Sequence, residues 1–154
     1  MTAKTRASRA GASTDRIEKR VVLRAPRARV WRAITDAKEF GTWFRLTLDG
    51  AFAVGKTVRG SHDNFKVEMR VERIEPERYF SYRWHPYPKD SSRDYAEEPM
   101  TLVEFTLEDA DGGTALTIVE SGFDRIPLER RAEAFRMNTE GWGGQIKNLA
   151  AYVS

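Results

Sequence analysis

A single carboxylate, Glu120, is placed by the sequence where it could do acid–base chemistry. Glu120 ends the run Ala115–Glu120, and by strand alternation it falls on the same face as Leu116 and Ile118. Proton transfer requires such a titratable group inside a dry pocket. Glu120 is therefore a candidate general acid or base. The alternative is a hydrogen-bonded or solvated carboxylate near the end of its strand.

Few other side chains offer catalytic chemistry. The chain has no cysteine, which excludes thiolate nucleophiles, disulfides and cysteine-based metal sites. The spacing of His62 and His85 matches no metal signature, so we expect both to be solvated and predict neither a metal nor a cofactor. No phosphate loop, dinucleotide fingerprint or nucleophile elbow occurs. Strand parity leaves Arg73 as a second inward polar group, which could contact Glu120.

Large aromatic side chains are the stronger signal. Several fall on rows that would converge if a helix covers a curved sheet, and such surfaces build apolar pockets with few polar anchors. Core packing alone explains each of them equally well. The predicted ligand-binding residues are Trp43, Phe44, Met69, Tyr82, Trp84, Phe105, Phe123, Gly141 and Trp142.

Strands of period two dominate the middle of the chain. Apolar residues alternate with polar ones over 65–71, 80–84 and 103–107, which predicts three strands with one buried and one wet face. Pro76 ends the first of them. The turn sequence Asp111-Gly112-Gly113 predicts a hairpin between the third strand and the run that carries Glu120. The stretch from Pro86 to Pro99, rich in proline and serine, is expected to be a long loop.

The C-terminal stretch predicts one long helix. Its apolar face recurs at spacings of three and four over about seven turns. The expected face is Leu128, Ala132, Phe135, Thr139, Trp142, Ile146, Leu149 and Val153. Gly141, Gly143 and Gly144 lie inside this helix, where each glycine costs roughly 1 kcal/mol relative to alanine. We expect either a close approach of the helix to the sheet or a kink that opens space for a ligand.

The N-terminal part predicts a strand over Arg16–Leu23, followed by two short helices. Pro26 fits the first position of the first helix, where its missing N–H costs nothing. Asp36 is expected to cap the second helix and Gly41 to close it. Trp43 and Phe44 would then stand just outside the helix end.

Composition excludes several classes of protein. The net charge is +3, and the basic residues Lys4, Arg6 and Arg9 account for it, since residues 15–154 are then formally neutral. We expect a disordered basic leader over 1–14 and a single domain over 15–154. A neutral domain offers no basic stripe for nucleic acid. No span is apolar enough to insert in a membrane, so a soluble, cytoplasmic protein is expected.

The order and spacing of these motifs resemble one family, the Activator of Hsp90 ATPase homologue-like proteins of the START-like, or Bet v 1-like, superfamily. The resemblance runs from about Arg16 to Val153. It rests on Ala25-Pro26 with Val30–Asp36 and Trp43-Phe44, on Thr114–Ile118 with Glu120–Phe123, and on Asn138–Trp142 with Ile146, Leu149 and Tyr152. It implies an α+β helix-grip fold: a curved antiparallel sheet of six to seven strands, a long C-terminal helix and two short helices after the first strand.

The resemblance implies three functions. The first is binding of a small hydrophobic or aromatic molecule between the sheet and the long helix. The second is a polyketide cyclase or hydrolase-like enzyme, with Glu120 or Tyr82 as acid or base. The third is a module that stimulates an Hsp90-type ATPase, with the chaperone as partner. The chain is expected to be a monomer or a homodimer.

Overall fold

The computed structural model describes residues 15–63, 65–87 and 98–154. The expected leader over 1–14 and residues 88–97 of the expected loop lie outside the described residues.

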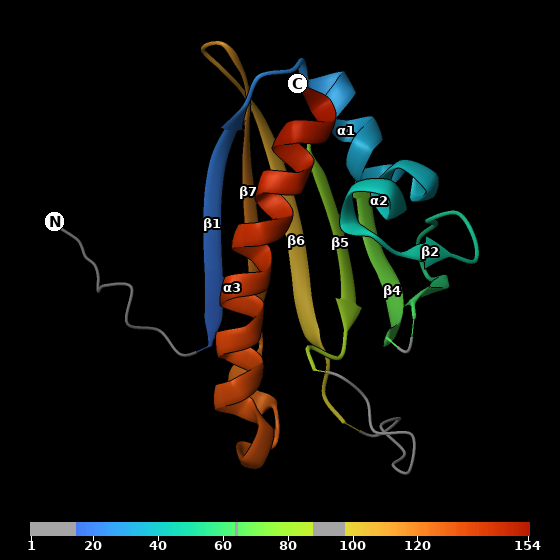
Figure 1. Cartoon of the computed structure of the whole chain (residues 1–154), viewed down its shortest axis with the longest axis vertical. Helices are drawn as coiled ribbons and strands as arrows, with labels where there is room; N and C mark the ends of the chain where they lie inside the picture. Colours follow the sequence, from blue (N-terminus) through green and yellow to red (C-terminus); the bar gives the residue numbers. More distant parts are fainter. Residues whose placement is uncertain (1–14, 64, 88–97) are drawn as a thin grey trace, which may run out of the picture.

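Seven antiparallel strands form one sheet, in the order β1-β7-β6-β5-β4-β3-β2 (Figure 1). The β6–β7 hairpin turns where Ala110 pairs with Gly113, as the turn sequence predicts. The strands are β1 Arg16–Leu23, β2 Thr47–Leu48, β3 Thr57–His62, β4 Phe65–Glu75, β5 Tyr79–Trp84, β6 Thr101–Ala110 and β7 Gly113–Ser121. Together with the helices below, this architecture confirms the helix-grip fold.

The helices cover one face of this sheet. The 26-residue helix α3 (Leu128–Val153) crosses in front of β7 and β6, and the short helices α1 (Arg27–Thr35) and α2 (Ala37–Phe44) lie beside it (Figure 1). A 3-10 turn, η1 (Phe123–Arg125), leads from β7 into α3. The apolar face of the sheet and the inner faces of the helices form one continuous hydrophobic core.

The second short helix is longer than expected. Asp36 caps it, since its side chain accepts hydrogen bonds from the N–H groups of Lys38 and Glu39. The helix then continues through Gly41, so Trp43 and Phe44 lie in its last turn rather than beyond it. Gly41 is needed for a close approach instead, because a Cβ there would stand 2.4 Å from the carbonyl oxygen of Leu46. Pro26 precedes α1 as its N-cap, one position before the expected one.

A β-bulge overturns the inward placement of Arg73. The β4–β5 register shifts between Val71 and Arg73, which moves Arg73 to the outer face. Its side chain is 65% exposed and forms an ion pair with Glu75. Ile74 packs against the core instead. A contact between Arg73 and Glu120 is therefore excluded.

The first turns of α3 also differ from the expected face. Leu128 is 76% exposed and Ala132 is exposed, whereas Ala134 is buried. Figure 1 shows the reason, since the beginning of α3 projects beyond the edge of the sheet where β1 begins. From Phe135 onward the helix buries its expected face, with Trp142, Leu149 and Val153 in the core.

The glycines of α3 are not packed closely. A Cβ added at Gly141, Gly143 or Gly144 would meet no atom within 4 Å, so the close-approach explanation is wrong.

Gly41 in α2 is closely packed and Gly144 in α3 is not, so alanine should have opposite effects on stability at the two positions. We expect Gly144→Ala to raise the free energy of unfolding by roughly 0.5–1 kcal/mol, because alanine loses less backbone entropy and meets open space. Gly41→Ala should lower it by roughly 1–3 kcal/mol, because the new methyl meets rigid backbone. Urea unfolding of both variants measures the two effects, and a destabilising Gly144→Ala would contradict the placement of α3.

Candidate functional site

Glu120 lies at the centre of a hydrogen-bonded cluster that joins the sheet to α3. The residue is fully buried. Its Oε2 accepts hydrogen bonds from Trp84 Nε1 at 2.8 Å and from Thr101 Oγ1 at 2.6 Å. Its Oε1 accepts one from Trp142 Nε1 at 2.8 Å. One carboxylate therefore connects β5, β6, β7 and α3.

Burial and hydrogen bonding act on this carboxyl in opposite directions. Removal from water raises the pKa of Glu120 above its ordinary 4.5, while the bonds from Thr101, Trp84 and Trp142 lower it, and burial prevails. The native protein therefore binds this proton more tightly than the unfolded chain does.

A pH dependence follows from this sign. Because the folded pKa is raised, the contribution of Glu120 to stability is greatest below the unfolded value and falls as pH rises through the folded one. We expect the stability difference between wild type and Glu120→Gln to be larger near pH 5 than near pH 8. Urea unfolding of both proteins across this range measures the difference. A difference that grows with pH would reverse the assigned shift.

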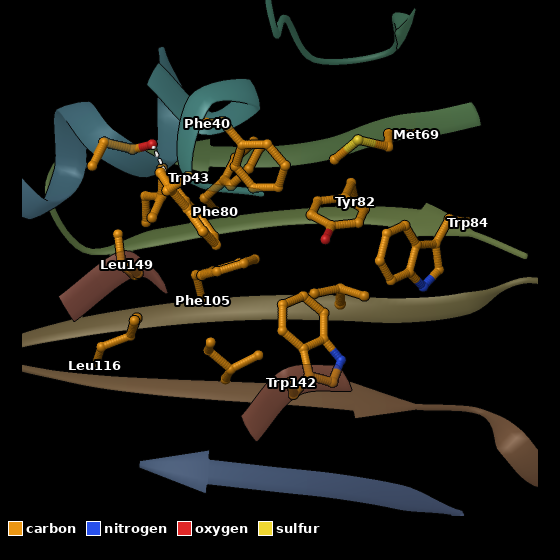
Figure 2. Packing of buried hydrophobic residues seen from close by; sticks show 14 of the residues in the cluster. Phe40, Trp43, Met69, Phe80, Tyr82, Trp84, Phe105, Leu116, Trp142 and Leu149 are labelled. Carbon is orange, nitrogen blue, oxygen red and sulfur yellow. Dashed lines mark hydrogen bonds between the residues drawn. The ribbon is translucent and has the colours of Figure 1, made fainter. Parts of the chain in front are cut away.

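The two indoles that bind Glu120 lie against each other. The rings of Trp84 and Trp142 are 5.9 Å apart at an interplanar angle of 29°, and Figure 2 shows the two indoles side by side. Phe44 packs edge-on against both rings at 6.0 Å. Phe105 closes the inner side of Trp142 at 5.8 Å. The indoles are thus fixed by ring contacts and by the hydrogen bonds to Glu120.

A groove opens above these indoles, between the end of α2, the middle of α3 and the β3–β4 hairpin. Its volume is about 360 Å³. We call this feature the groove; its lining residues are Phe44, Arg45, Leu46, His62, Phe65, Trp84, Asn138, Gly141, Trp142 and Gln145. A smaller pocket of about 90 Å³ continues it along β4 and shares Phe65, Trp84 and Asn138.

The structure divides the predicted ligand-binding residues into two groups. Phe44, Trp84, Gly141 and Trp142 line the groove. The others lie in the core: Trp43, Met69, Tyr82, Phe105 and Phe123 are buried and absent from the groove lining (Figure 2 shows the first four). These residues pack together in the hydrophobic core beneath α3.

Two buried polar side chains lie in the aromatic core. The hydroxyl of Tyr82 makes no hydrogen bond to any described residue, and burial followed by the charge of Glu120 raises the pKa of this phenol well above its ordinary value. Trp43 is satisfied, since its Nε1 donates to the carbonyl oxygen of Ala33 at 2.9 Å. Neither Tyr82 nor Glu120 lines the groove, and the indoles of Trp84 and Trp142 do.

The histidines differ from each other. His62 is exposed at the end of β3 and lines the groove, with Nε2 3.6 Å from the carboxylate of Asp63. His85 is half-buried rather than solvated, and its Nε2 lies 3.1 Å from the carbonyl oxygen of Glu98. In the part of the chain that the structure describes, no three His, Asp or Glu side chains are grouped to bind a metal ion.

Several site residues escaped the sequence reasoning. Thr101 shares the parity of Val103 and Phe105 and could have been found from it. Arg45 and Leu46 carried no signal, because α2 was expected to end at Gly41. Gln145 looks like an ordinary polar position of a helix, and Asn138 entered only as part of the family resemblance.

The model of one protein family, Activator of Hsp90 ATPase homolog 1-like protein, matches residues 24–154. The chain belongs to this family. A search of curated proteins finds no match. Among the described residues of this family member, no helix is long and apolar enough to cross a membrane.

Solved structures extend the comparison. Protein MLL2253 from Mesorhizobium loti is 25% identical, with a TM-score of 0.74 over 89% of this chain and 95% of that one. DynU16, a protein of the dynemicin biosynthetic locus, is 26% identical, with a TM-score of 0.71 over 90% of this chain and 46% of that one. The Aha1 dimer from Colwellia psychrerythraea shares the fold, with 15% identity and a TM-score of 0.72 over 90% of this chain and 95% of that one.

Proposed function

We propose that this protein binds a small hydrophobic or aromatic molecule in the groove. The observation that carries the proposal is a concave space of about 360 Å³ whose lining includes two indole rings. Binding sites for small molecules are mostly apolar, contain a few polar groups and have volumes of about 300–1,000 Å³. The groove fits this description, with aromatic walls from Phe44 and Phe65 and amides from Asn138 and Gln145.

The two indoles that line the groove are held in place before a ligand binds. Glu120 accepts a hydrogen bond from each indole nitrogen, and Phe44 packs edge-on against both rings. A preorganised surface gains affinity because little side-chain freedom is lost on binding. This role makes Glu120 a positioning residue. The relative DynU16 is named for a biosynthetic locus, which also favours a small organic molecule as the ligand.

A thermal-shift screen tests the proposal. Purified protein is heated with a broad set of apolar and aromatic molecules, and native mass spectrometry of the same preparation detects any ligand retained from the cell. A ligand at about 100 times its Kd should stabilise the fold by about 2.7 kcal/mol and should change the fluorescence of the groove indoles. If no molecule raises Tm and nothing is retained, the proposal is wrong.

Stimulation of an Hsp90-type ATPase is a second candidate function, favoured by the family whose model matches residues 24–154. It predicts a higher ATPase rate of an Hsp90-type chaperone when this protein is added at micromolar concentration. Sizing chromatography of the mixture reports the complex. An unchanged rate with no complex would exclude this function.

A further inference from the structure

Arg45 joins α2 to β2 with a left-handed backbone, at φ 68° and ψ 51°. Its N–H donates to the carbonyl oxygen of Gly41 at 2.8 Å and so ends the helix. Glycine is the residue usually found at such a position, because a Cβ disfavours this conformation. An arginine therefore occupies a position where the backbone alone would favour glycine.

The side chain of Arg45 is free to bind a ligand. Arg45 lines the groove and is exposed, and it forms no ion pair and no side-chain hydrogen bond with the described residues. By contrast, Arg59 and Arg83, on strands of the same sheet, pair with Glu68 and Glu72. The long apolar stem of an arginine can follow an apolar wall while its guanidinium stays at the mouth.

Of the polar side chains that line the groove, Arg45 is the one best placed to bind an anionic group. None of the residues that line the groove is an acid. The side-chain amide groups of Asn138 and Gln145 already donate to the carbonyl oxygens of Pro86 and Phe44. His62 faces the carboxylate of Asp63, which lies outside the lining. The lining of the groove thus combines aromatic rings with the one guanidinium of Arg45, which has no ion pair with the described residues.

We propose that the ligand of the groove is an amphipathic anion: an apolar or aromatic body with a carboxylate, sulfonate or phosphate group at one end. The body lies on Trp84 and Trp142, and Arg45 binds the anionic group. Guanidinium groups recognise such oxyanions through paired N–H donors. This inference rests on the proposed function, because it names the class of ligand for the same groove.

Two dyes of one shape test the inference. Anilinonaphthalene sulfonate is anionic, and N-phenylnaphthylamine has the same aromatic body without the sulfonate. Fluorescence titration gives the Kd of each dye for wild type, Arg45→Gly, Arg45→Lys and Arg24→Ala. Glycine suits the left-handed backbone, so Arg45→Gly keeps the helix end intact. Arg24 is exposed at the end of β1, and its removal changes net charge equally at the far edge of the sheet.

We expect Arg45→Gly to raise the Kd of the anionic dye about tenfold, since a hydrogen bond to a charged group contributes about one order of magnitude or more in affinity. The neutral dye should bind both proteins alike. Arg45→Lys should retain only part of the affinity for the anionic dye, because it keeps the charge but not the paired N–H donors. Arg24→Ala should change the Kd of neither dye. The tenfold difference should shrink near 1 M salt, where the Debye length is about 3 Å. Equal effects of Arg45→Gly on both dyes would overturn the inference and leave the groove as a neutral site. If neither dye binds wild type, the inference fails, and the thermal-shift screen decides the proposed function separately.

Discussion

Glu120→Ala should lower the free energy of unfolding by roughly 3–5 kcal/mol. The substitution leaves three buried donors without an acceptor, Trp84 Nε1, Trp142 Nε1 and the hydroxyl of Thr101, and it also creates a cavity. Each unsatisfied buried donor costs about 1–3 kcal/mol, and partial relaxation of the indoles keeps the total below the sum. Since Tm falls by about 2–4 °C per kcal/mol in a domain of this size, thermal unfolding should shift by roughly 10 °C.

Glu108→Ala is the matched control. Glu108 lies on β6, which pairs with β7, the strand of Glu120, and the side chain of Glu108 is exposed. Substitution of an exposed residue of this kind changes stability by about 0.5 kcal/mol or less. The indole fluorescence of Glu120→Ala should also change, because Trp84 and Trp142 lose their common acceptor, whereas the spectrum of Glu108→Ala should not. Similar stability losses in the two variants would show that Glu120 does not hold the cluster.

The inward placement of Glu120 was predictable from sequence because β7 is regular. No register shift interrupts its pairing with β1 or β6, so strand parity holds from Leu116 to Glu120. The same reasoning failed for Arg73, because the bulge in β4 inserts one residue and reverses the parity beyond it. Alternation in a sequence predicts a face only as far as the pairing remains regular.

The position of the groove could not be read from the sequence, because it depends on where α2 ends. Gly41 is a typical helix terminator, but α2 continues through it to Phe44, and the glycine instead allows the close approach of the Leu46 carbonyl. The three additional residues turn Phe44 onto the indoles and bring Arg45 to the rim. The aromatic residues were found as a set, but which of them pack into the core and which face open space is decided by tertiary packing.

Gly141→Phe should abolish ligand binding in the groove without unfolding the protein. Gly141 lines the groove, and a Cβ there meets no atom within 4 Å, so a phenyl group can enter the open space above Trp142. Phenylalanine also has a higher helix propensity than glycine, so α3 should be unchanged or slightly more stable. We expect the Kd of any groove ligand, including a naphthalene dye, to rise at least about a hundredfold, since the ring occupies the volume that the ligand needs.

Gly144→Phe separates occlusion of the groove from a general effect on α3. Gly144 lies in the same helix, and a Cβ there also meets open space, but Gly144 does not line the groove. This variant should bind ligand with wild-type affinity, measured by the same fluorescence titration. If both phenylalanine variants lose binding, the helix as a whole must move for the ligand to enter. If neither does, the ligand lies elsewhere and the groove is not its binding site.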